Sequence, residues 1–365
     1  MQFNRIATAV VGVAAALLQS TPSNAQAPAD FYAGKRLVIL VNYAPGGPAD
    51  IEGRFFARFI AKHIAGQPSV IVQNMDGAGG MVGATYLGEV APKDGTIVGM
   101  LTASAWQFAT ESAPRKVDFK TYEHVAYQPS TTVYFMRTDV APGIKTPADL
   151  GKAQGLIAGG LSADSAKDIM IRMTLDMLGV KYKYVTGYRG SNGARLAMQQ
   201  KEINFYSESP PSYRTVVAQS LVDKGDAIGL FYDPGWDGKT FSRSKQIEGL
   251  PIKSFPELYR EIKGEQPKGP LWDMYLTALQ LTGEVFRVAS MPPGTPKAAV
   301  DALRAAINKL ATDKEFAEEA QKAFSYVPEY VAGPDTADRV RKMLTTSPEL
   351  RKQVNEYVKL GAGVK

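Results

Sequence analysis

Apolar runs that end in glycine-rich loops and lead into amphipathic helical patterns recur along this chain, and this alternation most constrains its fold. The first run, 36–42, is almost wholly apolar, which is typical of a strand buried on both faces of a parallel sheet. A helix is expected over 51–65, with Asp50 placed to cap it. Further strands are expected over 69–73 and 96–101. Strands that alternate with helices predict an open, mostly parallel α/β sheet.

The same pattern starts again after about residue 154, so we expect a second α/β unit of similar size. Its expected strands are 155–159, 183–186 and 203–207, and its expected helices are 163–178 and 192–200. An irregular stretch rich in proline and glycine is expected to about residue 270. Beyond it we expect a strand near 285–289 and two or three helices, 298–310 and 339–344 among them.

The length of 365 residues predicts two domains, at about 100–200 residues each. We expect the first lobe to comprise 28–124 together with about 235–365, and the second to comprise about 125–234. The sequence leaves open which lobe the C-terminal helices pack against.

The first 25 residues have the features of a secretory signal peptide. Arg5 precedes an apolar or small run over 6–18, and Ser23-Asn24-Ala25 supplies small residues for cleavage. The run is shorter than the about 20 residues of a membrane span. We expect cleavage after Ala25 and a periplasmic protein, without a lipid anchor because the chain has no cysteine.

Composition excludes several kinds of chemistry. With no cysteine the chain has no thiolate nucleophile and no Cys-ligated metal. The two histidines, His63 and His124, lie far apart and lack HExxH spacing, so we expect no metal and no cofactor. We expect His63 in an amphipathic helix and His124 in a polar segment before a strand. An excess of 42 basic over 36 acidic residues, spread along the chain, does not favour nucleic acid.

Four loops between strands and helices, rich in glycine or other small residues, could bind an anion. Such loops leave backbone N–H groups uncovered, and the helix dipole adds partial positive charge there. Such a loop can bind a carboxylate or phosphate without Lys or Arg. The alternative is that the glycines only make tight turns. The loops are 43–50, 74–80, 160–164 and 187–191.

Other motif interpretations fail on spacing. The glycines before Lys239-Thr240 stand too close for a phosphate-binding P-loop, and Gly77-Ala-Gly79 lacks the third glycine of a dinucleotide site.

Three segments carry a resemblance to a known family. They are Pro45-Gly-Gly-Pro-Ala-Asp50, Asn74-Met-Asp-Gly-Ala-Gly-Gly80 and Ala91-Pro-Lys-Asp-Gly95. In this order they resemble motifs of the extracytoplasmic solute receptors of tripartite tricarboxylate transporters, the Bug receptors. Pro293-Gly-Thr-Pro296, near the C-terminal helices, fits the same order, so the resemblance covers essentially the whole mature chain.

The resemblance implies a bilobal, type II-like periplasmic binding protein, with two open α/β sheets joined by a hinge. Such a receptor is a monomer and not an enzyme; it closes on a small organic acid and delivers it to membrane permease subunits. In this family backbone amides and ordered water bind one ligand carboxylate. Carried over by position, the substrate-binding residues are Tyr43, Ala44, Gly46, Gly47, Asp50, Gly77, Ala78, Gly79, Gly80, Thr102, Ala103, Ser104, Ser162, Ala163, Asp164, Arg189, Gly190, Ser207, Glu208 and Ser209.

Some of these residues leave alternatives open. Arg189 stands where the family commonly has Lys, and it either pairs with a carboxylate or is a solvated loop charge. Glu208 departs from the family pattern; it either faces the cleft, where it would repel a second carboxylate or receive an amine or hydroxyl, or lies on the surface. Tyr43 and Trp106 stack on an aromatic ligand or belong to the core. Two other functions stay open, a receptor for a signalling partner and a hydrolase on a related scaffold.

Overall fold

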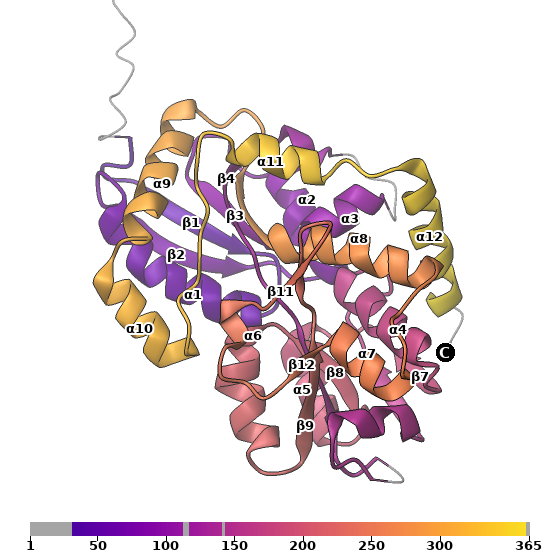
Figure 1. The fold of residues 1–365 in the computed structure, drawn as a ribbon. Coiled ribbons are helices and arrows are strands. Elements are labelled where there is room, and N and C mark those ends of the chain that lie inside the picture. Colours follow the sequence, from indigo (N-terminus) through magenta and orange to yellow (C-terminus); the bar gives the residue numbers. More distant parts are fainter. Residues whose placement is uncertain (1–30, 112–116, 141–142, 363–365) are drawn as a thin grey trace, which may run out of the picture.

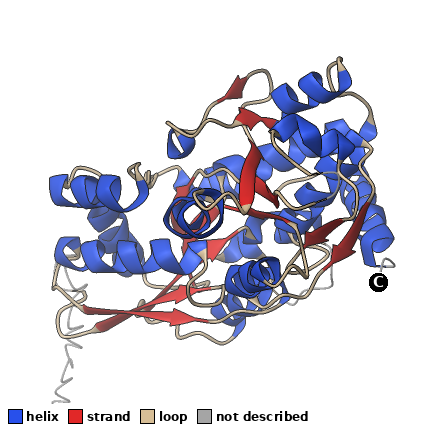
Figure 2. Ribbon diagram, turned by 90° about the horizontal axis from the view of Figure 1, so that it is seen from below, coloured by secondary structure: helices blue, strands red, loops and turns tan. Residues whose placement is uncertain are grey.

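The computed structural model describes residues 31–111, 117–140 and 143–362. The expected signal peptide therefore lies outside the described residues. The described part forms two lobes, each built around its own open sheet (Figure 1). Helices flank the strands of both sheets (Figure 2). The predicted open, mostly parallel α/β architecture is thus present, with one antiparallel strand, β13 or β5, inside each sheet.

The sheet of the first lobe has the order β2-β1-β3-β13-β4. Its parallel part consists of β1 (Arg36–Val41), β2 (Ser69–Asn74) and β3 (Ile97–Thr102), close to the expected ranges. Strand β13 (Arg287–Met291) lies between β3 and β4 (Glu123–Gln128) and is antiparallel to both. A segment from late in the chain therefore completes the first sheet.

Helices pack against this sheet on both sides. They are α1 (Pro48–Ile60), α2 (Met81–Glu89), α3 (Ser104–Thr110), α9 (Lys297–Leu310), α10 (Lys314–Phe324) and α11 (Thr336–Met343). The expected cap is wrong: α1 begins at Pro48 with Gly47 as N-cap, because proline fits the first helical position. Asp50 instead lies in the first turn and accepts a hydrogen bond from the N–H of Gly46 at 2.8 Å.

The second sheet has the order β12-β9-β5-β8-β6-β7. Its strands are β5 (Val133–Arg137), β6 (Leu156–Gly159), β7 (Tyr182–Val185), β8 (Phe205–Glu208), β9 (Ala227–Tyr232) and β12 (Lys253–Ser254). Strand β5 is antiparallel to both of its neighbours, β8 and β9. The main helices around it are α4 (Ala166–Leu178), α5 (Gly190–Gln199), α7 (Phe255–Lys263) and α8 (Pro270–Glu284). Short α6 (Pro210–Ser212) leads into a π-helical segment, Tyr213–Val222.

Two sequence expectations about local structure are wrong. The stretch expected to be irregular contains the hairpin of β10 (Gly235–Trp236) and β11 (Phe241–Ser242), followed by β12 and α7. In the described residues, four helices rather than two or three follow β13, and the last of them is α12 (Pro348–Ala362). Strands of two residues are too short to show an alternating pattern, and their positions depend on neighbours distant in sequence.

His124 lies inside β4 and is fully buried, not in a polar segment before a strand. Its Nδ1 atom is 2.9 Å from Ser290 Oγ on β13, and Phe119 packs edge-on against the imidazole. Burial lowers the pKa of His124 to about 3, so the ring is neutral. The residue is structural, as expected, but because it packs inside a strand rather than because it lies in a polar segment.

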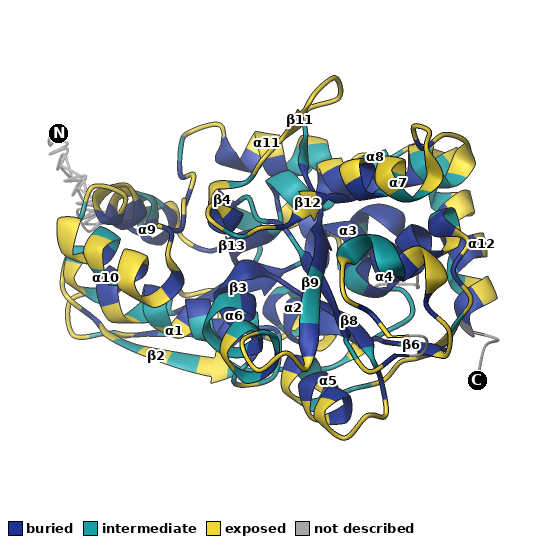
Figure 3. Ribbon diagram, turned by 60° about the horizontal axis from the view of Figure 1, so that its bottom comes forward, coloured by how far each residue is buried: buried dark blue, intermediate teal, exposed yellow. Residues whose placement is uncertain are grey.

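The core consists of the strands and the inward faces of the helices. Figure 3 shows buried residues along the strands and exposed ones on the outer faces of α10 and α12. We propose that membership of the two sheets marks the lobes. The chain then passes to the second lobe over 129–132, between β4 and β5, and returns between β12 and β13.

Candidate ligand-binding site

A cavity lies between the two lobes, where several strands end and helices begin. Its volume, including the part that opens to solvent, is about 660 Å³. Six of the residues predicted from sequence line it: Tyr43, Ala44, Gly47, Thr102, Ala103 and Ser209. The first five belong to the first lobe and Ser209 to the second, so the cavity is shared by both lobes.

A shallower depression adjoins the cavity and takes in two of the predicted loops. Gly77, Ala78, Gly79 and Gly80 line it from the first lobe, and Arg189 and Gly190 from the second. Tyr43 and Leu161 line both spaces, and the Tyr43 hydroxyl donates a hydrogen bond to the carbonyl of Gly79 at 2.7 Å. The ring of Tyr43 therefore stands between the cavity and the depression.

Two helices begin at the cavity wall. Gly47, Pro48 and Ala49 line it where α1 starts, and Ala166 and Lys167 line it where α4 starts. The first N–H groups of a helix lack intrahelical partners, and the dipole makes that end partly positive. Helix N-termini of both lobes thus make the cavity favourable for an anion.

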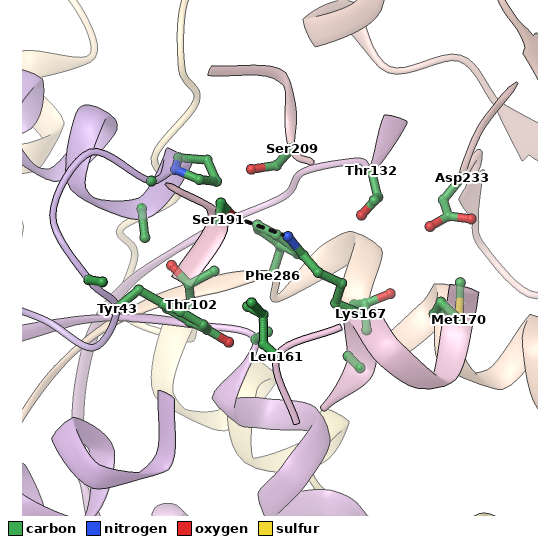
Figure 4. A pocket seen from close by; sticks show the side chains of 17 residues that line it. Tyr43, Thr102, Thr132, Leu161, Lys167, Met170, Ser191, Ser209, Asp233 and Phe286 are labelled. Atoms are coloured by element: carbon green, nitrogen blue, oxygen red, sulfur yellow. Dashed lines mark hydrogen bonds between the residues drawn. The ribbon is translucent and has the colours of Figure 1, made fainter. Parts of the chain in front are cut away.

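Lys167 is a cation at the cavity, and the sequence did not predict it there. Its Nζ atom donates to the carbonyl of Ser207 at 2.9 Å and lies 3.4 Å from Ser191 Oγ (Figure 4). Burial lowers the pKa of Lys167 to about 8, although Glu208 and Asp168 oppose the shift. Its position in the sequence was the available signal. A lysine in the first turn of a helix is disfavoured by the helix dipole, which suggests that it has another role there.

Asp233 supplies a carboxyl group to the same cavity. Its Oδ2 accepts the Tyr134 hydroxyl at 2.8 Å and its Oδ1 the Tyr275 hydroxyl at 2.9 Å. Burial raises the pKa of Asp233 to about 7, against the lowering effect of the two tyrosines. The sequence signal was an acid directly after the buried strand β9 and before Pro234, where parallel sheets commonly present ligand-binding side chains.

Glu208 neither faces the cavity nor lies on the surface. Its fully buried carboxylate accepts two hydrogen bonds from Nη1 of Arg195, at 2.7 and 2.9 Å. Burial raises the pKa of Glu208, while Arg195 and Lys167 lower it. The other terminal nitrogen of Arg195, Nη2, donates to the carbonyl of Gly46 in the first lobe at 2.9 Å.

Several predicted residues hold loops in place. Burial alone would raise the pKa of Asp50, but hydrogen bonds from Arg54, Gly46 and Asn74 lower it below its ordinary value. Asn74 donates to Asp50 Oδ1 at 2.9 Å, so Asp50 connects the first two loops. Ser104 is buried and accepts a hydrogen bond from Asn42 at 3.0 Å.

Other predicted residues join the lobes or lie in the core. Arg189 Nε donates to Asp76 Oδ2 at 2.7 Å with its side chain largely exposed. Asp164, which also accepts from Ser162, is 3.3 Å from Gln107 Nε2 of the first lobe. Ala163 lies between Ser162 and Asp164 in the loop before α4. Ser207 is fully buried, and Trp106 is buried in the core.

The hydrogen bonds from Arg195, Arg189 and Gln107 all connect the two lobes. The lobes are therefore in contact around the cavity, as in a closed receptor. Within the described ranges, no three Asp, Glu or His side chains gather closely enough to hold a metal ion. None of the helices described has the length and hydropathy needed to cross a bilayer.

Solved structures of solute-binding proteins are similar to this one. The periplasmic binding protein BugD is 18% identical and superposes with a TM-score of 0.63, covering 92% of this chain and 99% of its own. MatC from Rhodopseudomonas palustris with bound malate is 16% identical with a TM-score of 0.63, covering 88% and 99%. The chain has the fold of the Bug and TctC solute-binding proteins. An R. palustris protein with adipate is 15% identical with a TM-score of 0.66, covering 89% and 98%.

Curated relatives match over part of the sequence. A UPF0065 protein in the TAR-I ttuE-ttuC′ intergenic region of Agrobacterium vitis is 32% identical over 191 residues, which is 49% of this chain. The match spans 53% of that relative, about half its length. A UPF0065 protein in the gbd 5′ region of Cupriavidus necator is 38% identical over 92 residues, 25% of this chain and 28% of the relative. No protein-family model matches the chain. The predicted fold class and resemblance are confirmed by these similarities.

Proposed function

We propose that this chain is a periplasmic receptor that binds a small organic carboxylate in the interlobe cavity and delivers it to the permease of a tripartite tricarboxylate-type transporter. The observation that carries the proposal is Lys167 Nζ at a cavity where α1 and α4 begin. A buried cation with helix N-termini of both lobes suits a carboxylate. Similar folds solved with malate and adipate agree with this ligand class.

Binding in the cavity would couple ligand to closure. Tyr43, Ala44 and Gly47 belong to the first lobe, while Lys167 and Ser209 belong to the second. A carboxylate between them contacts both lobes only when they are together, so it stabilises the closed state that a permease would recognise. The receptor would act as a monomer without changing its ligand.

The first test is binding. We expect small carboxylic acids to raise the melting temperature of the mature protein, and native mass spectrometry to detect ligand retained through purification. Calorimetry on Lys167→Met should show about 10- to 100-fold weaker binding, because a charge-assisted hydrogen bond contributes about 1.5–3 kcal/mol. Lys152→Met, at a largely exposed lysine, is the matched control. Absence of any shift across a broad panel of carboxylates would overturn the proposal.

The second test concerns the partner. Membranes that contain the permease subunits should retain the ligand-loaded receptor and release the apo form. Retention by a sensor kinase instead of the permease would favour the signalling alternative.

One contact favours a second candidate, a hydrolase. Ser191 Oγ lies 3.4 Å from Lys167 Nζ, and a lysine with a lowered pKa can act as general base to a serine. NMR of candidate esters and amides incubated with the protein tests this function. Turnover that is lost in Ser191→Ala would support the hydrolase against the receptor.

A further inference from the structure

The cavity has a lysine ammonium group on one wall and an aspartate carboxyl group on another. Lys167 extends toward Ser191 in Figure 4, and Asp233 lies on the other side of that view, with Thr132 between them. Lys167 comes from α4, whereas Asp233 follows β9. A ligand that touches both therefore meets a cation at one place and a carboxyl group at another.

The carboxyl group of Asp233 is fixed in position. Its backbone N–H donates to the carbonyl of Thr132 at 3.0 Å, and its own carbonyl accepts the Thr131 hydroxyl at 2.5 Å. The side chain is held by Tyr134 and Tyr275, one hydroxyl on each oxygen. Because both its backbone and its side chain are hydrogen-bonded, Asp233 keeps its carboxyl group at the cavity wall when a ligand binds.

The carboxyl group of Asp233 is placed to accept a hydrogen bond from a group that donates one. Both carboxylate oxygens already take a phenolic proton, and each retains a further acceptor position. Among the residues that the structure describes, neither Lys nor Arg pairs with Asp233, which is 7% exposed. A buried carboxylate without a cation is costly, so a donor supplied from the cavity would stabilise it.

The wall around the two charged groups includes apolar side chains. Met170 and Phe286 line the cavity together with Leu161, all uncharged. A ligand with an apolar middle would contact these side chains while its ends reach the polar groups.

We propose that Asp233 determines specificity by receiving a hydrogen-bond donor of the ligand, so that the preferred ligand is a carboxylic acid with a hydroxyl or ammonium group at its far end. This inference rests on the proposed function, since it assumes that the ligand carboxylate is bound on the Lys167 side. At a pH above about 7, where Asp233 is ionised, a dicarboxylic acid would instead bring a second carboxylate against a like charge.

The test uses straight-chain acids of four to six carbons that differ only at the far end: methyl, hydroxyl, ammonium or a second carboxylate. We expect calorimetry on the wild-type protein to show about tenfold or tighter binding of the hydroxy or amino acid than of the methyl-ended and dicarboxylic acids of equal length. Preference for the amino acid alone would identify an ammonium ligand, and preference for the hydroxy acid a hydroxyl. In Asp233→Asn, the preference for the hydroxy or amino acid over the dicarboxylic acid should fall at least tenfold. The reason is that the amide of Asn can donate a hydrogen bond to the second carboxylate.

Asp338→Asn, at an exposed aspartate on α11, is the control and should keep the wild-type order. Asn is nearly the same size as Asp, and a melting curve checks that the Asp233 variant folds. If the Asp233 variant does not fold, the test uses Tyr275→Phe. This variant removes one donor from Asp233 and should therefore strengthen the preference for the hydroxyl- or ammonium-ended acid. Equal or tighter wild-type binding of the dicarboxylic acid, or an unchanged order in the Asp233 variant, overturns the inference and leaves the carboxylate receptor standing. Failure of every acid to bind overturns both.

Discussion

Arg195 Nη2, on α5 of the second lobe, lies 2.9 Å from the carbonyl oxygen of Gly46 in the first lobe. The other terminal nitrogen of this guanidinium, Nη1, forms an ion pair with the fully buried Glu208. The contact between the lobes is therefore anchored to a buried ion pair rather than to a mobile surface side chain.

Removing Arg195 alone should destabilise the protein strongly. Arg195→Met leaves the Glu208 carboxylate buried without its partner, which costs about 3–5 kcal/mol of unfolding free energy. Chemical denaturation measures this loss. The double variant Arg195→Met/Glu208→Gln removes both charges and should recover most of it. A double variant as unstable as the single one would contradict this account.

The approach of the lobes at Gly190 should be sensitive to a single methyl group. A Cβ at Gly190 would lie 2.8 Å from the Cβ of Ala44 in the first lobe, and the backbone there has φ +71°. Gly190→Ala should weaken ligand binding because it obstructs closure. Gly155→Ala is the matched control, with φ +70° and open space around the added methyl. Titration of both variants with the same acid separates closure from backbone strain, and equal affinities would exclude obstruction.

Arg189 should matter little for affinity. It pairs with Asp76 across the lobes, but its side chain is 84% exposed, and such pairs are weak. Arg189→Ala should change the dissociation constant by less than about threefold at physiological salt. A much larger loss in calorimetry would mean that the guanidinium reaches the ligand directly, which is the alternative that the sequence left open.

Asp233 should make stability fall as pH rises. Its folded-state pKa is about 7, above the ordinary value of 3.8, so between these values the folded protein keeps a proton that the unfolded chain releases. The unfolding free energy then decreases with pH by at most about 1.4 kcal/mol per unit, and the loss is complete above pH 7. Denaturation of wild type and Asp233→Asn across pH 4–8 should show a steeper fall of the unfolding free energy in the wild type than in the variant.

Lys167 should limit ligand binding at high pH. Its pKa is lowered to about 8, and a carboxylate binds its protonated form. Affinity for an acid with a methyl group at its far end should therefore fall as the pH rises above about 8. Lys167→Arg, which stays charged, should bind at pH 9 as well as at pH 7. Calorimetry over this range decides, and parallel curves for both proteins would assign the titration to another group.

The sequence predicted most of what depends on local patterns. Strands β1 and β3 are continuous apolar runs, and the loops that follow them end at one edge of a sheet, so Tyr43, Gly47 and Thr102 meet at the cavity. Strand β13 near its expected position was also predictable, but not its place between β3 and β4, because pairing between distant segments leaves no periodic signal.

The charged groups of the cavity could not be found by the same reasoning. Glycine-rich loops indicate binding by backbone amides, whereas Lys167 reaches the cavity from the first turn of a helix. Asp233 reaches it only because β9 pairs with β5, and Tyr134 on β5 then holds its carboxylate. Similarly, Glu208 looked like a cleft or surface charge until the fold brought Arg195 against it.

The insertion of β13 has a consequence for how the molecule is made. Strands β3 and β4 are complete at Gln128, yet the strand that joins them ends only at Met291. A nascent chain shorter than this has a gap in the middle of its N-terminal sheet, with the backbone groups of β3 and β4 unsatisfied on that side. The N-terminal half therefore cannot reach its final form while the ribosome is still synthesising the second sheet, and the molecule matures only when its last third arrives.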